Sequence, residues 1–116
     1  MTYTIYHNPN CSKSRKTLEI LKTKVTDIRI VEYLKTPPDQ NELRDIINKL
    51  NIKPKELIRF NDYKAKELRV SFEDDFSLEE WISILVNNPK LIERPIVVFE
   101  ERGIIGRPPE NVLKLF

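Results

Sequence analysis

The hydrophobic and polar positions near the N-terminus predict a strand, a helix and a second strand. Residues 3–6 are β-branched and aromatic, which is typical of a short strand, and the polar residues 8–10 end it. From residue 12 onward, apolar side chains recur every three or four positions, which predicts a helix. These apolar positions are Leu18, Leu21 and Val25. Residues 27–34 alternate again and predict a second strand, which must be parallel to the first because a crossover helix joins them.

The middle of the chain predicts further helices. Asp39 is expected to cap the first of them, with Glu42 three positions on. Pro54 is expected to open a short second helix. Ser77 and Glu80 have the spacing of a capping box at the start of another helix. The positions expected to face the core are Leu43, Ile46, Ile47, Leu50, Leu78, Trp81, Ile82, Leu85 and Val86.

The C-terminal part predicts a hairpin and a last helix. Residues 96–99 are continuously apolar, which is typical of a buried strand, and we expect Gly103 to turn the chain back into residues 104–105. The two prolines at 108–109 are expected to start the last helix. Its expected inward-facing residues are Val112, Leu113 and Phe116.

Together these elements predict an α/β (α+β) fold in a single domain spanning residues 1–116. A mixed four-stranded sheet flanked by helices fits their order along the chain. This arrangement is that of a thioredoxin-like fold with a helical insertion at about residues 39–92. The length of 116 residues is right for one core and too short for two full domains.

The composition argues against several classes of function. Charged residues make up 33% of the chain and hydrophobic residues 40%, and the net charge of +2 comes from mixed signs without a basic block. We therefore expect no nucleic-acid partner. The N-terminus has no secretory signal and no apolar run reaches membrane-spanning length, so we expect no membrane association and a cytoplasmic location. With one cysteine and one histidine, neither an internal disulfide nor a Cys-rich or His-based metal site is expected.

The single cysteine, Cys11, lies between the first strand and the first helix. Unpaired backbone N–H groups and the positive end of the helix dipole favour the thiolate there, and the thiolate is the attacking form. The alternative is a small buried apolar side chain, as many lone cysteines are. Ser14 takes the third position after Cys11, so the motif is Cys-X-X-Ser. An oxidised Cys11 must therefore be resolved by a thiol from another molecule.

His7 and a group of arginines are the other candidates for chemistry. His7, four residues before Cys11, would take the thiol proton as a neutral ring or stabilise the thiolate as a cation; the alternative is a strand-end histidine bonded to backbone. Arg94 and Arg107 lie at predicted strand or loop edges, and Arg59 ends a short helix. Two or three guanidinium groups around a thiolate would bind a tetrahedral oxyanion, although spacing alone does not bring them together.

Longer segments carry a resemblance to a known family. The stretch 7–18 resembles the active-site segment of glutaredoxin-coupled arsenate reductases. Residues 91–98 and 105–110 match further segments of that family. The shorter matches are Tyr33-Leu34, Pro37-Pro38 and Leu57-Ile58-Arg59. The resemblance covers nearly the whole chain in order, and the chain is similar to a shorter branch of the family, whereas some members carry a longer C-terminal tail.

The resemblance implies roles for these residues. Cys11 would be the nucleophile, and His7 matches a histidine thought to favour the thiolate. Arg59, Arg94 and Arg107 would hold the oxyanion. Pro95 matches the cis-proline of the thioredoxin-like fold, which with Ser14 would shape the site. The implied substrate is arsenate, with glutathione as the reductant and glutaredoxin as the partner, no bound cofactor or metal, and a monomeric protein.

Two other functions stay open from the sequence. Transcription regulators that bind RNA polymerase share the fold and resemble this chain around Cys11 and at residues 94–96. They often carry a Cys-X-X-Cys switch, which Ser14 removes here, and they lack the Gly-Arg-Pro-Pro-Glu segment at 106–110. The other possibility is a monothiol oxidoreductase without arsenate turnover, which would need Cys11 but not all three arginines.

Overall fold

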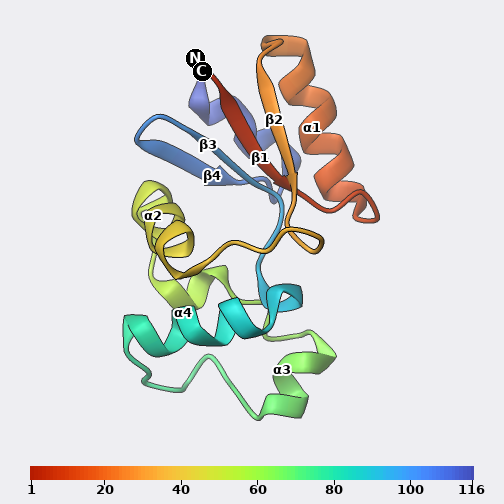
Figure 1. The fold of residues 1–116 in the computed structure, drawn as a ribbon. Helices are drawn as coiled ribbons and strands as arrows, with labels where there is room; N and C mark the ends of the chain where they lie inside the picture. Colours follow the sequence, from red (N-terminus) through yellow and green to blue (C-terminus); the bar gives the residue numbers. More distant parts are fainter.

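The computed structural model describes residues 1–116. Figure 1 shows a sheet with helices on both faces and a helical segment that extends beyond one end of it. The strands are β1 (Tyr3–His7), β2 (Ile28–Glu32), β3 (Ile96–Phe99) and β4 (Arg102–Ile105). The α-helices are α1 (Ser12–Lys24), α2 (Gln40–Leu50), α3 (Tyr63–Leu68) and α4 (Leu78–Asn87), and the 3₁₀ helices are η1 (Pro54–Leu57), η2 (Pro89–Leu91) and η3 (Pro109–Leu115).

The sheet is mixed and has four strands in the order β2-β1-β3-β4. β1 pairs with β2 in parallel, with Ile5 opposite Ile30. β3 is antiparallel to both of its neighbours, with Val97 opposite Ile5 on one side and Ile104 on the other. The predicted parallel pair, the C-terminal hairpin and the mixed four-stranded thioredoxin-like sheet are therefore confirmed.

Two hydrophobic clusters cover the two faces of the sheet. Ile5 and Val97 point to the face that α1 and η3 cover, where Leu21, Val112 and Leu115 are buried. The neighbouring strand residues Tyr6, Ile96 and Val98 point to the opposite face, because successive side chains alternate along a strand. That face packs against the helical segment from α2 to η2, whose bounds of 40 and 91 agree with the predicted insertion.

The helix starts follow the capping residues. The Asp39 side chain accepts the Glu42 N–H at 2.8 Å. Ser77 and Glu80 form a reciprocal capping box, with the Ser77 hydroxyl accepting the Glu80 N–H and the Glu80 carboxylate accepting the Ser77 N–H. These local predictions are confirmed. No helix of the structure combines the length and hydrophobicity that a membrane crossing requires.

Some inward-facing predictions are wrong. Leu78 is 40% exposed because it stands in the first turn of α4, before the buried stripe begins. The last helix is a 3₁₀ helix, in which residues three apart share a face. Val112 and Leu115 are therefore buried, whereas Leu113 and Phe116 are 42% and 52% exposed.

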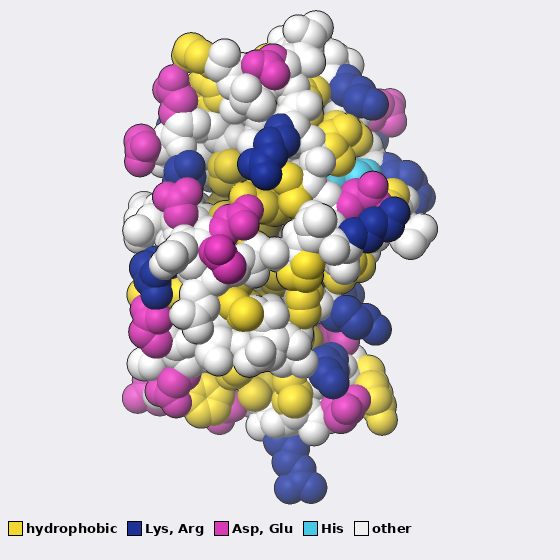
Figure 2. All heavy atoms as spheres, in the orientation of Figure 1, with side chains coloured by type: hydrophobic (Ala, Val, Ile, Leu, Met, Phe, Trp, Pro, Cys, Tyr) yellow, Lys and Arg dark blue, Asp and Glu magenta, His cyan; other side chains and the backbone are white.

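The predicted turn of the hairpin is also wrong by a few residues. Gly103 lies inside β4, opposite Val98, and the chain reverses at Glu100 and Glu101. Glu100 adopts a left-handed backbone conformation with φ of 54°, so the turn forms without a glycine. Figure 2 shows basic and acidic side chains interspersed over the face in view, in agreement with the mixed charge pattern of the sequence.

Candidate active site

Cys11 is the N-cap residue of α1. Its backbone is extended, with φ of −102° and ψ of 122°, and its carbonyl accepts the first helical hydrogen bond, from the Arg15 N–H at 3.0 Å. The Cys11 N–H donates to the Asn8 carbonyl at 3.0 Å, which fixes the loop between β1 and α1. The thiol is free and partly exposed. It is therefore both held at the helix start and open to a reactant.

The surroundings of Cys11 favour its thiolate. Burial by itself raises the pKa of the thiol, but the backbone N–H groups of Ser14 and Lys13 at the start of α1 favour the thiolate and lower the pKa. The Arg94 and Arg107 guanidinium charges lower it further, and the net pKa lies below the ordinary value of a cysteine. Arg59 is not among the main causes of this shift in the pKa of Cys11.

His7 lies beside the cysteine loop and is connected to it through Ser14. His7 Nδ1 is 2.6 Å from the Ser14 hydroxyl oxygen, which also accepts the Asn8 N–H at 3.0 Å. Both side chains are buried. Burial lowers the pKa of His7, which disfavours an imidazolium beside the thiolate. In this geometry His7 orients Ser14 and the loop, and neither the hydrogen bonds nor the charges acting on Cys11 include His7.

Arg59 comes to the site through a pairing between two segments of the helical insertion. Ile58 and Ile92 form an isolated antiparallel bridge. On either side of it, the Arg59 N–H donates to the Leu91 carbonyl at 2.8 Å and the Glu93 N–H donates to the Leu57 carbonyl at 2.7 Å. This pairing places Arg59 next to the chain that continues into Arg94.

Arg94 and Arg107 come from the two ends of the β3–β4 hairpin. The peptide bond before Pro95 is cis, as is the one before Pro108. The Gly106 N–H donates to the Pro95 carbonyl at 2.9 Å, and Arg107 Nη1 donates to the Arg94 carbonyl at 3.3 Å. The hairpin pairing therefore brings together two arginines that are thirteen residues apart.

Gly106 is a residue of the site that the sequence analysis did not single out. A Cβ at this position would lie 2.5 Å from the Thr17 hydroxyl oxygen and 2.8 Å from Pro95 Cγ. Thr17 is a fully buried residue of α1, so the missing side chain lets the cysteine helix pack directly on the loop that carries Arg107. This role of Gly106 depends on the Thr17 and Pro95 side chains, which come close to it only in the folded chain.

The three predicted arginines line one cleft of about 330 Å³, which we call the arginine cleft. Its lining residues are Ile58, Arg59, Phe60, Asn61, Asp62, Glu93, Arg94 and Arg107. Cys11 is not part of this lining and is related to the cleft through Arg94 and Arg107. Arg94 Nε is buried and has no hydrogen-bond partner, which leaves a charged donor free for a ligand.

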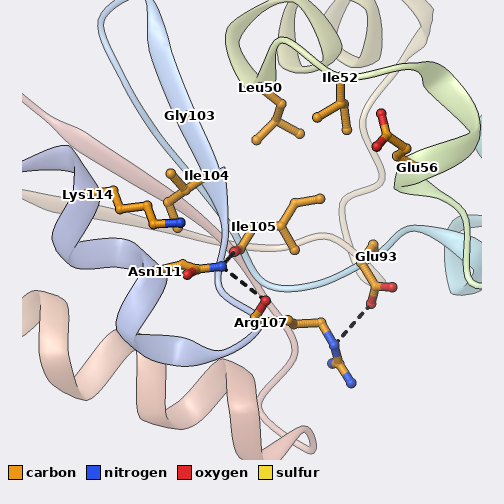
Figure 3. A pocket seen from close by; sticks show the side chains of 10 residues that line it. All are labelled: Leu50, Ile52, Glu56, Glu93, Gly103, Ile104, Ile105, Arg107, Asn111 and Lys114. Atoms are coloured by element: carbon orange, nitrogen blue, oxygen red, sulfur yellow. Dashed lines mark hydrogen bonds and ion pairs between the residues drawn. The ribbon is translucent and has the colours of Figure 1, made fainter.

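Two carboxylates stand among these guanidinium groups. Asp62 is 3.2 Å from Arg59 Nη1, and Glu93 lies near both Arg94 and Arg107. Glu93 and Arg107 also line a neighbouring cavity of about 430 Å³, shown in Figure 3, where the Glu93–Arg107 pair stands at one end. Neither carboxylate was predicted, because their placement depends on the bridge between residues 58 and 92.

Tyr33, which the sequence analysis named only as part of a family match, also lies near the site. It follows β2 and is 1% exposed. Burial raises the pKa of its phenol, while the Arg94 and Arg59 charges and a hydrogen bond with Asn8 act in the opposite direction. The Cys11 charge also acts on the pKa of Tyr33, so the phenol lies near both the sulfur and the arginines.

No group of three or more His, Cys, Asp or Glu side chains is arranged to hold a metal ion.

The sheet order and the cysteine at the start of α1 define a thioredoxin-like α/β protein. Within that class the chain belongs to the ArsC family, whose sequence model matches residues 6–115. It is 46% identical over 112 residues to the uncharacterized protein YfgD of Escherichia coli (strain K12), covering 96% of this chain and 93% of that one. It is 38% identical over 109 residues to an arsenate reductase of Neisseria meningitidis serogroup A, covering 93% and 92% of the two chains.

A solved structure of an arsenate reductase from Vibrio cholerae has the same fold. Its TM-score with this chain is 0.93 and its sequence identity is 37%, over 100% of this chain and 98% of that one. The family and the fold expected from the sequence are therefore confirmed. The individual roles of Cys11, His7, Ser14, Pro95 and the three arginines remain predictions.

Proposed function

We propose that this protein reduces arsenate to arsenite and that Cys11 is the nucleophile. The observation that carries the proposal is a cysteine whose pKa is lowered by Arg94 and Arg107, two guanidinium groups that also line the arginine cleft. The unpartnered Arg94 Nε supplies a donor for a bound oxyanion. Relatives of similar length that bear the name arsenate reductase support the same activity.

The first step is a displacement at arsenic. The Cys11 thiolate attacks arsenic(V), a sulfur–arsenic bond forms and one arsenic–oxygen bond breaks. The departing hydroxyl takes up a proton and leaves as water, so arsenic keeps its oxidation state. Arg59, Arg94 and Arg107 would hold the remaining oxygens and offset the charge that grows on them in the transition state.

The second step transfers two electrons to arsenic. A glutathione thiolate attacks the Cys11 sulfur, a disulfide bond forms, and the sulfur–arsenic electron pair stays on arsenic, which leaves as arsenite. Because the chain has no second cysteine, the resulting Cys11–glutathione disulfide needs an external thiol. We propose glutaredoxin for this step. Overall, two thiols are oxidised to one disulfide for each arsenate reduced.

The remaining parts of the proposal concern the setting of the reaction. We infer a cytoplasmic location, since a reducing compartment keeps a lone thiol available. We also infer a monomer with no bound cofactor. Every group assigned to the reaction comes from one chain, and the free thiol is partly exposed to an incoming reductant.

The test is a coupled assay with purified protein, arsenate, glutathione and glutaredoxin, in which arsenite formation is measured. The wild-type protein should form arsenite, and Cys11→Ser should form none, since it removes the only sulfur nucleophile. Loss of arsenite formation in the wild type, with retained cleavage of glutathione mixed disulfides, would instead identify a monothiol oxidoreductase. Retention of the RNA polymerase α subunit in a pull-down, without arsenite formation, would identify a transcription regulator.

A further inference from the structure

Glu93 places a carboxylate beside Arg94 and Arg107 in the arginine cleft, whose other carboxylate, Asp62, pairs with Arg59. The Glu93 Oε1 atom lies 3.5 Å from Arg107 Nε and 3.7 Å from Arg94 Nη1, and it accepts the Arg94 backbone N–H at 3.3 Å. None of the hydrogen bonds or ion pairs in the structure involves its second oxygen, Oε2. Figure 3 shows one carboxylate oxygen directed at Arg107 and the other pointing away from that pair.

The backbone keeps Glu93 in this place. The Glu93 N–H donates to the Leu57 carbonyl at 2.7 Å, next to the bridge between Ile58 and Ile92. The side chain is 24% exposed, so it lies in the wall of the cleft and is not free to swing into solvent without breaking both arginine pairs. A bound oxyanion would therefore meet this carboxylate together with the guanidinium groups.

A carboxylate has opposite effects on different oxyanions. Ionised carboxylate oxygens only accept hydrogen bonds. Arsenate and phosphate keep at least one proton at neutral pH, so they present an O–H donor as well as bare oxygens. Sulfate has no proton at neutral pH and presents bare oxygens only. A bare oxygen beside Glu93 gains no hydrogen bond and is repelled by the carboxylate charge.

We propose that Glu93 makes the site select tetrahedral oxyanions that carry a proton, with Glu93 Oε2 accepting the hydrogen bond from the oxyanion hydroxyl. The guanidinium groups bind the bare oxygens in the same complex. A site built around a substrate hydroxyl rejects analogues that lack it, because its acceptor is then left unpaired. This proposal names the class of anion that the site selects. It rests on the proposed function only in taking arsenate as the selected anion that is then reduced.

A purely positioning role for Glu93 predicts something different. If the carboxylate only orients Arg94 and Arg107, its loss should weaken the binding of all tetrahedral oxyanions by a similar factor. If Glu93 instead selects anions that carry a proton, its loss should change the ratio between the binding constants of a protonated and an unprotonated oxyanion. Phosphate and sulfate form the best pair of probes, since both are tetrahedral and neither is reduced by thiols.

The experiment measures how these anions protect Cys11 from alkylation by iodoacetamide at pH 7 and constant ionic strength. Wild type should be protected at lower concentrations of phosphate than of sulfate. In Glu93→Gln the side-chain amide also donates, so the phosphate-to-sulfate preference should fall by about tenfold. Glu93→Asp keeps a carboxylate and should still prefer phosphate. The matched control is Glu79→Gln, which removes a glutamate paired with Arg44 at 2.8 Å on the surface and should behave as wild type.

Two results would overturn the proposal: equal protection of the wild type by phosphate and sulfate, or an unchanged preference in Glu93→Gln. The readout does not depend on turnover. A protein that prefers phosphate through Glu93 but forms no arsenite in the coupled assay would keep the selection and lose the proposed reaction. A protein that forms arsenite but shows no Glu93-dependent preference would keep the proposed reaction and lose the selection.

Discussion

The two regions that supply the arginines of the cleft hold them differently. Arg59 comes from the helical insertion, where its Nη1 atom lies 3.2 Å from Asp62 and 3.0 Å from the Lys90 carbonyl. Arg94 and Arg107 come from the ends of the β3–β4 hairpin and share the more distant Glu93 carboxylate, and Arg94 Nε has no partner. Arg59 is therefore held by partners within its own region, whereas the hairpin arginines share a single carboxylate and include a buried donor without a partner.

The difference extends to the sulfur. The backbone groups of Ser14 and Lys13, and after them the Arg94 and Arg107 charges, lower the pKa of Cys11, and Arg59 is not among these main causes. In the proposed reaction, the hairpin end would add to the stabilisation of the thiolate and would bind the oxyanion, while Arg59 of the helical insertion would bind the oxyanion only. Two regions that meet at one cleft can in this way contribute separately to reactivity and to affinity.

The largest expected effect separates Arg107 from Arg59. Arg107→Ala should lower kcat/KM for arsenate by about 100-fold, because it removes a donor to the transition state and a charge that stabilises the thiolate. Arg59→Ala should cost about tenfold and act mainly through a higher KM. Steady-state kinetics in the coupled assay measures both. Equal losses with the same division between kcat and KM would show that the two regions do not differ in role.

A smaller effect tests how the cysteine helix is joined to the hairpin end. Gly106→Ala should lower the free energy of unfolding by about 1–3 kcal/mol, because the new methyl group meets Thr17 and Pro95 at well under van der Waals contact. The matched control is Gly103→Ala, where the nearest atoms are side-chain carbons of Val98 and Leu50 at 3.1 and 3.2 Å. It should change stability by less than about 1 kcal/mol.

Urea unfolding followed by circular dichroism compares the two glycine variants. A smaller loss of stability in Gly106→Ala than in Gly103→Ala would contradict the close packing of α1 on the Arg107 loop. The comparison also bears on activity, since any shift of this loop moves Arg107 relative to Cys11.

The sequence predicted those features of the fold that depend on neighbouring residues. The capping residues Asp39 and Ser77 start their helices as expected, and the β-α-β unit at the N-terminus follows from its alternating pattern. The last helix was assigned the wrong inward face, because the pattern of Val112, Leu113 and Phe116 was interpreted with α-helical spacing. A 3₁₀ helix changes which residues share a face.

The site itself was only partly predictable, because its assembly depends on contacts between distant segments. The family resemblance pointed to Cys11 and three arginines, but the Ile58–Ile92 bridge that brings Arg59 beside Glu93 has no local signature. The same holds for Tyr33, which looks like an ordinary strand-end aromatic residue. For His7 the sequence suggested an effect on the thiol, which stays a prediction, and its contact with Ser14 was not foreseen.

The most direct test of the account is the pH dependence of Cys11 alkylation, which is a clean measurement because the chain has one cysteine. A lowered pKa means that thiolate persists at lower pH, so the midpoint for wild type should lie below the free-cysteine value of about 8.5. Arg94→Ala and Arg107→Ala should raise the midpoint, and Arg59→Ala should raise it less than either of them. A wild-type midpoint at or above the free-cysteine value would contradict the central claim that this end of the fold activates Cys11.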